Sequence, residues 1–518
     1  MQGAFRLVTK AEQQLLDRAY TKLTGLPSIL LMENAGKALA DAVLSVDTAA
    51  QAAVYDCLIF AGKGQNGGDG YVAARHLQSE GLKVAVVDVS SGEAHRNDAA
   101  VNVSAWTKLG GEIIRDLTRV PTDQVPVIID AIYGSGFALD RKIDEEAVHA
   151  FALMRELQEN GSTVVACDLP SGLHADTGQV SSLSLKADLT VTFGRVKLGL
   201  ITHPGCLYSG EIWLETLGMD DDFVDRQLRG DPAYILDAAL ASTLDSKVAD
   251  DAHKGVNGRA LLIGGSENMP GAMLLSIEAC ARSGAGYTMV RAPEEIIPLL
   301  AEALPSALYS AIPEGENKKR DLPGPLDSIA IGMGASDAGW IAKALSSLIP
   351  NEKRLLIDAD GLNALAKMPQ ADELLQERRE KGLEPPVLTP HPGEFERLAP
   401  ELTSLLQEDR VGAARSLARK KSLIVVLKGM ATVVAFPDGT VFINESGNSG
   451  MAKAGSGDVL TGMIAGNMAV LKDSRKAVLL SVYLHGLAAD IALSDDDDPR
   501  SLLPEDILAN ISAARQTL

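Results

Sequence analysis

Short apolar runs alternate with longer, more polar segments along most of the chain. The runs in the first half are rich in Val, Ile, Leu and Ala, and they cover residues 56–61, 83–89, 126–131, 163–170 and 187–194. Segments with the mixed composition of helices separate these runs, for example YVAARHLQSEG at 71–81. Buried strands that alternate with helical stretches are typical of parallel α/β sheets. The first half therefore predicts a parallel α/β sheet.

A second series of the same kind begins after a charged segment at 219–232. Its apolar runs cover residues 259–265, 287–292, 328–334, 354–360, 385–390 and 423–429. The segments MATVVAF and GTVFIN are joined by Pro437, Asp438 and Gly439, which predicts a β-hairpin. A long helical stretch follows at 476–493.

The length of the chain limits how it divides into domains. A single hydrophobic core rarely serves more than ~250–300 residues, and this chain has 518. We therefore expect one α/β domain over residues 1–220, a linker over residues 221–230 and a second α/β domain over residues 231–518.

Charge and composition narrow the range of partners. The formal net charge is -21, which argues against binding to a nucleic-acid backbone or an anionic membrane surface. The four cysteines form no Cys-x-x-Cys pair, which is typical of reduced thiols. The N-terminus lacks a signal-peptide core, and no segment approaches the ~18–20 apolar residues of a membrane span. We expect a cytoplasmic protein without nucleic-acid or membrane partners, and a homo-oligomer because such assemblies are common.

A glycine-rich loop, GKGQNGGDG, occupies residues 62–70 between a predicted strand and a predicted helix. Gly62, Gly64 and Gly67 fit the dinucleotide-binding pattern G-x-G-x-x-G, and Asp88 ends the next strand. A tight strand-to-helix turn would need glycine as well, so the pattern alone leaves both interpretations open. The further glycine and acid in NGGDG exceed what a dehydrogenase requires.

Oxygen-bearing side chains also follow other predicted strands. Asp130 ends one strand and Asp168 another, with Ser171 close behind. Ligands of open α/β sheets bind at the carboxyl ends of the strands. Asn66, Asp130 and Ser171 could converge there as ligands of a hard cation. The alternative is that the two Asp residues cap the helices that follow.

The segments LPSILLMENAG, GQNGGDG, DAIYGSGF and DLPSGL resemble the N-terminal domain of the NAD(P)H-hydrate epimerase family. The resemblance covers roughly residues 1–220. It implies a Rossmann-like fold, interconversion of R and S hydrates, and a potassium ion at Asn66, Asp130 and Ser171. It also implies a catalytic Asp168, which contacts substrate together with Gln65, Asn66, Gly67, Gly68, Asp69, Gly134, Ser135, Gly136, Phe137, Ala138, Leu139 and Asp140. Gln65 replaces the second Asn that is usual in the family, so we expect altered reach rather than lost function.

A second glycine-rich segment, SGNSGMAKAGSGDVLTG, occupies residues 446–462. Its core, Gly455-Ser456-Gly457-Asp458, opens a predicted helix, where backbone N–H groups can bind a phosphoryl group during transfer. Asp458 could take a proton from a substrate hydroxyl. The alternative is an ordinary helix cap with an acid in the first turn, although so many glycines make a costly cap.

Other candidate residues of the second half lie near strand ends. Lys428 and Thr432 follow the run LIVVL and suit contacts with phosphate, although Lys428 alone is typical of a solvated strand end. His391 lies in the turn TPHPGEFERL, whose prolines restrict its conformation. The sequence contains no Walker A pattern.

Six ordered motifs of the second half resemble the ADP/ATP-dependent NAD(P)H-hydrate dehydratases, namely HKGxxGR, GGS…GA, DADGLNAL, TPHPGEFERL, KGxxT and GSGDVLTG. The resemblance runs from about residue 231 to the C-terminus and implies a ribokinase-like fold. The residues that it places on the hydrate are Ala272, Gly334, His391 and Asp458. Those that it places on the nucleotide are Lys428, Gly429, Met430, Ala431, Thr432 and Gly457. Lys453 and Ser456 occupy positions that vary in the family.

Together the two resemblances imply an enzyme that repairs hydrated NADH and NADPH. The first domain would interconvert the R and S hydrates. The second would use ADP and Mg²⁺ to convert the S hydrate to NAD(P)H, AMP and phosphate, with Asp458 taking the C6 hydroxyl proton. The residues do not decide between ADP and ATP; ADP is the usual bacterial choice in the family. Three alternatives stay open: a kinase of a vitamin-like alcohol, a dehydrogenase built on G-x-G-x-x-G, and a first domain that only binds a ligand.

Overall fold

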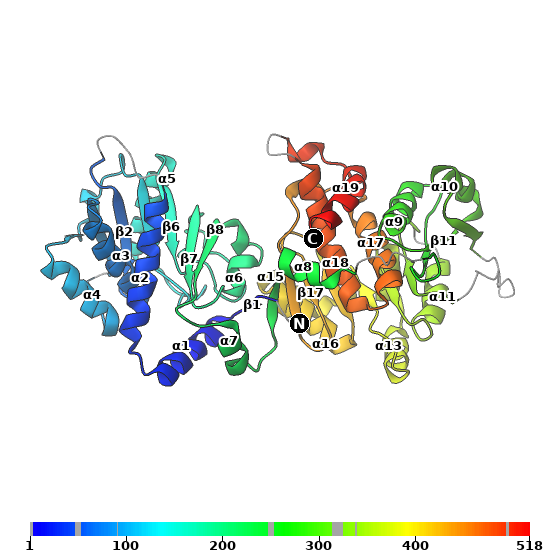
Figure 1. Ribbon diagram of the computed structural model, residues 1–518, viewed down its shortest axis with the longest axis horizontal. Coiled ribbons are helices and arrows are strands. Elements are labelled where there is room, and N and C mark those ends of the chain that lie inside the picture. Colours follow the sequence, from blue (N-terminus) through cyan, green and yellow to red (C-terminus); the bar gives the residue numbers. More distant parts are fainter. Residues whose placement is uncertain are drawn as a thin grey trace. The chain divides into compact units, whose positions relative to one another are not determined.

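The computed structural model describes residues 4–46, 53–90, 92–246, 253–312, 325–336, 339–493 and 497–518. These residues form two compact units, which divide the chain between residues 232 and 233 (Figure 1). The first unit starts at Arg6, and the residues before it belong to the second unit. The expected linker over 221–230 is mostly helix α7 (Asp221–Gln227), because Phe223 and Val224 are buried in the core of the first unit.

The first unit contains a sheet of seven parallel strands in the order β4-β3-β2-β5-β6-β7-β8. The strands are β2 (Cys57–Gly62), β3 (Val84–Val89), β4 (Glu112–Ile114), β5 (Val127–Ala131), β6 (Thr163–Cys167), β7 (Leu189–Phe193) and β8 (Glu211–Glu215). The other elements are strand β1 (Arg6–Leu7) and helices α1 (Lys10–Thr24), α2 (Ser28–Ser45), α3 (Gln65–Ser79), α4 (Asn97–Lys108), α5 (Glu145–Glu159) and α6 (Leu198–Ile201). The structure thus confirms the parallel α/β sheet.

Alternation along β2 shows why this sheet is covered on both faces. Cys57 and Ile59 pack into one apolar cluster with residues of α2 and α3. Leu58 and Phe60 pack into a second cluster with residues of α5. Because successive side chains of a strand point to opposite faces, a continuous apolar run requires a core on each side. The carboxyl ends of the strands remain open for a site.

The second unit has a larger mixed sheet with the strand order β9-β18-β17-β16-β15-β14-β13-β10-β11-β12. These strands are β9 (Ala233–Leu236), β10 (Arg259–Ile263), β11 (Tyr287–Ala292), β12 (Leu308–Ala311), β13 (Ser328–Ile331), β14 (Leu355–Ile357), β15 (Val387–Leu388), β16 (Ile424–Leu427), β17 (Val433–Ala435) and β18 (Val441–Asn444). Strands β17 and β18 pair antiparallel, and Gly439 between them has a φ of 89°. The predicted hairpin is therefore confirmed.

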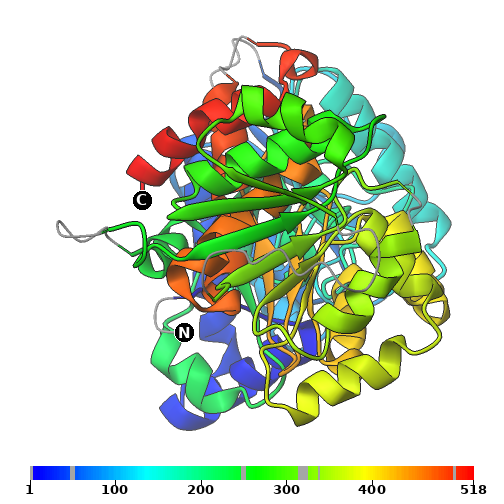
Figure 2. The same ribbon diagram turned by 90° about the vertical axis from the view of Figure 1, so that its right-hand side faces the viewer.

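Helices lie on both sides of this second sheet (Figure 2). They are α8 (Ala238–Leu244), α9 (Pro270–Arg282), α10 (Ile297–Ala303), α11 (Gly339–Leu348), α12 (Asp360–Lys367), α13 (Ala371–Glu380), α14 (Pro392–Leu398), α15 (Thr403–Glu408), α16 (Arg410–Lys421), α17 (Ser456–Leu471), α18 (Ser474–Ala492) and α19 (Pro504–Gln516). Helix α17 is almost entirely buried and packs in one apolar cluster with α9, α18 and α19. A Cβ atom at Gly462 would lie 2.1 Å from the carbonyl oxygen of Ser276, so glycine allows α17 to approach α9 closely.

A helix that crosses a membrane must be both long and apolar. None of the helices in the described ranges meets both conditions.

Candidate functional site

The carboxyl ends of the strands in the first unit border a cavity of about 580 Å³. Its wall includes six of the residues expected to contact substrate in the two loops, namely Gln65, Asn66, Asp69, Gly134, Ser135 and Gly136. Asp168 lines the same cavity, so the structure brings the expected catalytic residue together with these loops. Residues 138–140 are not part of the wall as far as the structure describes it.

Three more residues that were expected to contact substrate, Gly67, Gly68 and Phe137, pack against other parts of the chain and are not in the cavity wall. A Cβ atom at Gly67 would lie 1.8 Å from the carbonyl oxygen of Gly62, so the loop can close only with glycine there. At Gly68 a Cβ atom would lie 2.8 Å from the terminal methyl of Met32. Phe137 is buried, and its ring lies 5.6 Å from that of Tyr133 between centroids. These residues shape the wall through packing.

Asp168 is held by an ion pair at the end of β6. Its Oδ1 accepts hydrogen bonds from Lys197 Nζ at 2.6 Å and from Thr192 Oγ1 at 3.3 Å. Its Oδ2 accepts from the backbone N–H of Ser135 at 3.2 Å. The φ of Asp168 is 67°, a conformation that side chains other than glycine seldom adopt and that occurs often at functional sites. The protein therefore fixes this carboxylate in one orientation.

Two further acids line the same cavity. Burial raises the pKa of Asp69 well above its ordinary value, and the nearby charge of Asp168 raises it further. Burial also raises the pKa of Asp17, although Gln13 Nε2 donates a hydrogen bond to its Oδ1 at 2.8 Å. A group of buried acids with displaced pKa values is characteristic of catalytic sites.

Asp130 and Ser171, two of the expected cation ligands, contact each other in the first unit. The backbone N–H of Ser171 donates to Asp130 Oδ2 at 2.7 Å, and the Ser171 hydroxyl donates to Asp130 Oδ1. Burial raises the pKa of Asp130 to about 6, although these hydrogen bonds from Ser171 oppose the shift. Asn66 Nδ2 is buried and has no hydrogen-bond partner among the described residues. Among the described residues, only neutral groups donate to the Asp130 carboxylate, so these oxygen-bearing side chains could hold a cation.

The Asp88 carboxylate contacts two basic side chains. It is buried, and its carboxylate lies 3.4 Å from His95 Nε2 and 3.4 Å from Arg115 Nε. Although burial opposes ionisation, the hydrogen bond from His95 holds the pKa of Asp88 below its ordinary value. The cavity wall does not include Asp88. The structure therefore gives no support to a ribose-binding role, on which the dehydrogenase interpretation depends.

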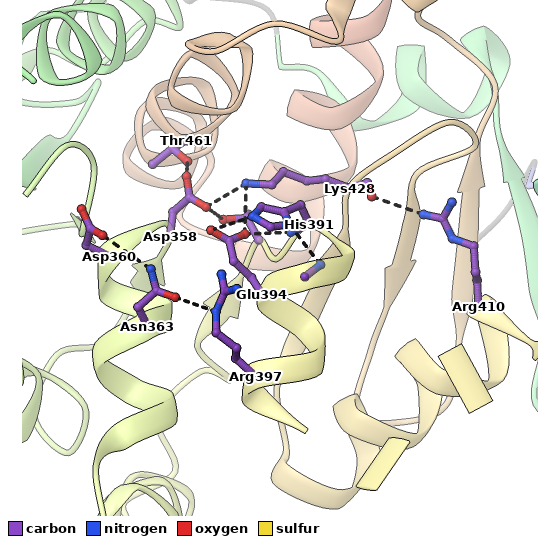
Figure 3. A network of polar contacts seen from close by, with 11 residues as sticks. Asp358, Asp360, Asn363, His391, Glu394, Arg397, Arg410, Lys428 and Thr461 are labelled. Carbon is purple, nitrogen blue, oxygen red and sulfur yellow. Dashed lines mark hydrogen bonds and ion pairs between the residues drawn. The ribbon is translucent and has the colours of Figure 1, made fainter. Parts of the chain in front are cut away.

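In the second unit, the carboxylate of Asp358 lies at the centre of a polar network (Figure 3). Its Oδ1 accepts from Thr389 Oγ1 at 2.7 Å and from Lys428 Nζ at 3.0 Å, and its Oδ2 accepts from Thr461 Oγ1 at 2.6 Å. Burial alone would raise the pKa of Asp358, but the Lys428 ammonium and these hydrogen bonds hold it below its ordinary value. The network connects the ends of β14, β15 and β16 to helix α17.

Asp458 lies in the first turn of α17, beside this network. Burial raises its pKa to about 7, and the negative charge of Asp358 adds to the shift while Lys428 opposes it. The hydroxyl of Ser276 donates to the carbonyl oxygens of Ala272 at 3.0 Å and Asp458 at 2.9 Å. A carboxyl group that titrates near neutral pH is suited to act as a general base.

Lys428 connects the expected nucleotide-binding residues to this acid cluster. Its Nζ lies 3.9 Å from Glu394 Oε2, and a Cβ atom at Gly457 would lie 3.4 Å from the same Nζ. The turn that follows contains Gly429 with a φ of 140° and Ala431 with a φ of 52°. Thr432 Oγ1 closes the turn by donating to the Gly429 carbonyl at 2.8 Å, and the Met430 side chain is exposed. The lysine thus lies beside the start of α17.

The remaining hydrate-binding candidates are arranged around the same helix start. His391 caps α14 through Nδ1, which accepts from the N–H of Gly393 at 3.1 Å, and its side chain is 53 % exposed. Glu394 Oε2 accepts from the N–H of His391 at 2.8 Å. Gly334 has a φ of 57°, and a Cβ atom there would lie 2.9 Å from that of Ala272. Ala272 and Gly334 are therefore neighbours, and there is no room for a side chain at Gly334.

Comparison with known proteins assigns both halves of the chain. The family model described as "YjeF-related protein N-terminus" matches residues 28–199, and that described as "NAD(P)H-hydrate dehydratase" matches residues 260–512. The Bifunctional NAD(P)H-hydrate repair enzyme Nnr of Moorella thermoacetica is 36% identical over 519 residues, which cover 97% of this chain and 95% of the relative. The chain belongs to the family of bifunctional NAD(P)H-hydrate repair enzymes.

A second relative matches the chain over a similar extent, and one solved structure is similar to part of it. The Bifunctional NAD(P)H-hydrate repair enzyme Nnr of Escherichia coli is 31% identical over 495 residues, which cover 96% of this chain and 91% of the relative. An ADP/ATP-dependent NAD(P)H-hydrate dehydratase from Bacillus subtilis, co-crystallised with ATP/Mg²⁺, is 33% identical with a TM-score of 0.48. It covers 55% of this chain and 98% of its own.

Several side chains of the two sites in this repair-enzyme chain were not predicted from the sequence. They are Gln13, Asp17 and Lys197 in the first unit, and Ser276, Asp358, Thr389, Glu394 and Thr461 in the second. Asp358 carries the signal that selected Asp130, because it also ends an apolar run. Lys197 carries no such signal, since one lysine behind a strand is common.

Proposed function

We propose that this chain restores hydrated NADH and NADPH in two reactions. The first unit interconverts the R and S hydrates, and the second dehydrates the S form with ADP as phosphoryl donor. The observation that carries the proposal is Asp458, whose pKa is about 7 and which lies at the start of α17 beside the Lys428–Asp358 pair. This arrangement offers a base, a cation and a helix N-terminus for one phosphoryl transfer.

The dehydration chemistry follows from the poor leaving ability of hydroxide near neutral pH. Asp458 accepts the proton of the C6 hydroxyl while the hydroxyl oxygen attacks the terminal phosphoryl group of ADP and AMP departs. The ring nitrogen then expels the C6 phosphate, and loss of a proton from C5 completes the C5–C6 double bond. The products are NAD(P)H, AMP and phosphate. Two protons are released, of which the phosphate takes one and solvent takes the other.

Lys428 and the amides at Gly455 to Gly457 supply the positive potential for this transfer. The Lys428 ammonium is fixed by Asp358 at 3.0 Å, so it needs little reorganisation when a phosphate arrives. Asp360 and Glu394 both raise the pKa of Asp458, which marks an excess of negative charge around the lysine. A magnesium ion bound with ADP would offset that excess and neutralise phosphate charge.

No protein-only metal site is evident around this cluster. Among the residues that the structure describes, no group of three or more His, Cys, Asp and Glu side chains is arranged to hold a metal ion. Magnesium commonly binds through one or two carboxylates together with substrate phosphates. We therefore assign the ion to the nucleotide complex, where the carboxylates of Asp360 and Glu394 could serve as protein ligands.

In the first unit we assign the cavity beside Asp168 to the hydrate. Asn66, Asp130 and Ser171 would hold a potassium ion, whose charge compensates the Asp130 carboxylate next to a dinucleotide phosphate. The support for this assignment is the set of oxygen atoms on Asp130 and Ser171, together with the finding that only neutral groups of the described residues donate to the Asp130 carboxylate. Both members of the Asp168–Lys197 ion pair line this cavity, which favours a catalytic role over a role in binding alone.

The compartment and the assembly state also belong to this proposal. We place the enzyme in the cytoplasm, since Cys57, Cys167 and Cys280 are buried thiols, a state typical of reducing compartments. A homo-oligomer is proposed only on the general prevalence of such assemblies. Sedimentation of the full chain at several concentrations would measure its assembly state directly.

Product analysis tests the central proposal. The full chain is incubated with a mixture of hydrated NADH epimers, ADP and Mg²⁺, and the absorbance of restored NADH is followed. We expect complete restoration, with AMP and phosphate formed in equal amounts. A stable phosphorylated product, with no NADH restored, would instead identify the second unit as a kinase. ATP in place of ADP, at equal concentration, measures the donor preference.

A further inference from the structure

Three carboxyl groups share the cavity of the first unit with one ammonium group. Asp17 comes from α1, Asp69 from α3, Asp168 from the end of β6, and Lys197 from the segment after β7. The charges of Asp17, Asp168 and Lys197 all act on Asp69. Buried like charges oppose one another's ionisation. The charges of Asp168 and Asp17 therefore disfavour an ionised Asp69.

The Lys197 ammonium is fully used by the protein. It is 1% exposed, and it donates to Asp168 Oδ1 at 2.6 Å, to Thr192 Oγ1 at 3.1 Å and to the Phe193 carbonyl at 2.6 Å. An ammonium group has three N–H donors, and each of these has an acceptor. Lys197 therefore has no proton to offer a substrate. Among the three acids it donates a hydrogen bond to Asp168 alone, and it acts on the other two only through its charge.

Asp168 keeps one oxygen available to the cavity. Its Oδ1 already accepts from Lys197 and Thr192, whereas Oδ2 accepts only from the N–H of Ser135 at 3.2 Å. A carboxylate oxygen can accept two hydrogen bonds. Oδ2 also faces the loop at Gly134, where a Cβ atom would lie 3.3 Å from it. A hydroxyl group in the cavity can thus donate to Oδ2.

Asp69 is as buried as Asp168, but it does not share the contacts of Asp168. Its side chain is buried, and its carboxyl group has no hydrogen-bond partner among the described residues. A buried carboxylate without a hydrogen bond or a contacting cation is costly, whereas a neutral carboxyl group is tolerated. Burial and the charge of Asp168 accordingly raise its pKa well above the ordinary value. The protonated form of Asp69 is therefore favoured, and it can offer its proton to the cavity.

We propose that Asp69 is the proton donor and Asp168 the proton acceptor of hydrate epimerisation, with Lys197 as the residue that positions Asp168. This inference rests on the epimerase function proposed for the first unit. Two nearby acids held in different protonation states can divide the acid and base roles of one reaction. No further charged group is required to move the proton.

The proposed reaction inverts C6 through ring opening. Asp168 Oδ2 removes the proton of the C6 hydroxyl, the oxygen electrons form a C6 carbonyl, and the C6–N1 bond breaks. Its electron pair moves to N1, which takes the proton of Asp69. Rotation about the C5–C6 bond presents the other face of the carbonyl, and N1 attacks it to close the ring. Asp168 then returns its proton to oxygen, and Asp69 recovers its proton from N1.

The test compares variants of the full chain in the absence of nucleotide, so that the dehydratase is idle. Asp69→Asn is the decisive variant because a carboxamide matches a neutral carboxyl group in shape and burial. We expect kcat for interconversion of separated epimers to fall ~10²–10⁴-fold, the range typical of lost acid–base catalysis. KM for the hydrate should change little. Asp116→Asn, at a helix cap outside the cavity, should retain the wild-type rate.

Two further measurements separate failure of this inference from failure of the proposed function. A wild-type chain that does not interconvert the epimers faster than buffer would refute the epimerase function itself. An active wild type combined with an Asp69→Asn variant of near wild-type kcat, or one changed only in KM, would overturn the acid assignment alone. Lys197→Met should lower kcat for epimerisation and leave KM for the hydrate nearly unchanged, since Asp168 loses the ammonium group that orients it; an unchanged kcat would refute the positioning role.

Discussion

Lys428 Nζ and Asp358 Oδ1 lie 3.0 Å apart in the second unit and form an ion pair between the ends of β16 and β14, in which Asp358 is buried and Lys428 is partly buried. The remaining carboxylate contacts, from Thr389 and Thr461, fix this pair from both sides. Breaking such a pair from one side typically costs ~3–5 kcal/mol, because the other charge stays buried. The pair therefore holds a positive charge rigidly beside the first turn of α17, where Asp458 lies.

Asp458→Asn should abolish dehydration of the S hydrate. Asn keeps the shape of the side chain but cannot accept the hydroxyl proton, and loss of a general base typically costs ~10²–10⁴-fold in rate. Binding of ADP, measured by calorimetry, should be largely retained. Asp473→Asn, the same substitution at the cap of the next helix, serves as the control. An Asp458→Asn chain that restores NADH near the wild-type rate would refute the base assignment.

The dehydration rate should fall as pH drops through about 7, the pKa of Asp458. Only the ionised carboxylate can accept the hydroxyl proton, so protonation removes the active form. Asp358 contributes more to this raised pKa than Asp360 does. The acidic limb should therefore move to lower pH in Asp360→Asn and further in Asp358→Asn. Unfolding midpoints of both variants control for lost stability, and limbs that do not move would contradict the electrostatic explanation.

The parts of the sites that the sequence predicted share one local signal. Asp130, Asp168 and Asp458 each stand at the end of an apolar run or at the start of a helix. Parallel strands bring such positions to one edge of a sheet, so a local pattern implies a spatial cluster. Asp358 has the same signal and could have been selected with them. These positions were predictable because the sheet itself determines where they lie.

Contacts that depend on tertiary register could not be predicted in this way. Lys197 reaches Asp168 because β6 and β7 are neighbours in register, with Cys167 opposite Val191. Asp17 lines the cavity because α1 packs there, which its own amphipathic pattern does not specify. The edge strand β8 has half-exposed residues rather than a continuous apolar run, and for that reason it was missed. Packing decides each of these features.

The two activities should complement each other between separate chains. A full chain with Asp168→Asn should consume the S hydrate with ADP and leave the R hydrate, beyond its spontaneous epimerisation. A full chain with Asp458→Asn should interconvert the epimers without restoring NADH. A mixture of the two variants should clear both epimers, because the hydrate can diffuse from one active chain to the other. Clearance of both epimers at equal rates by the Asp168→Asn chain alone would remove the need for an epimerase.

Epimerisation should depend on a monovalent cation, and Asp130 should mediate this dependence. The Asp130 carboxylate is buried, and its hydrogen-bond donors are neutral groups of Ser171 and Ile132. A dinucleotide phosphate near an uncompensated carboxylate would be repelled by ~4 kcal/mol at ~4 Å and an effective dielectric of 20. A bound potassium ion removes that repulsion, so hydrate affinity and turnover should rise with potassium in the wild type.

Asp130→Asn distinguishes an ion ligand from a residue that only holds a turn. Asn keeps an oxygen to accept from Ser171 but lacks the charge that a potassium ion requires. The ion assignment predicts lost potassium stimulation and weaker hydrate binding with the fold retained. The structural alternative predicts a stability loss of ~0.5–2 kcal/mol, the usual cost of a lost cap, with unchanged potassium response.

Epimerisation is measured against potassium at constant ionic strength, with choline chloride as the replacement salt. Ser79→Ala, which removes a hydroxyl that donates to the His76 carbonyl at the surface outside the cavity wall, controls for loss of a hydrogen bond elsewhere. A wild-type enzyme that is equally active after complete removal of monovalent metal ions would refute the cation site, since the buried carboxylate would then need no ion to accept the substrate.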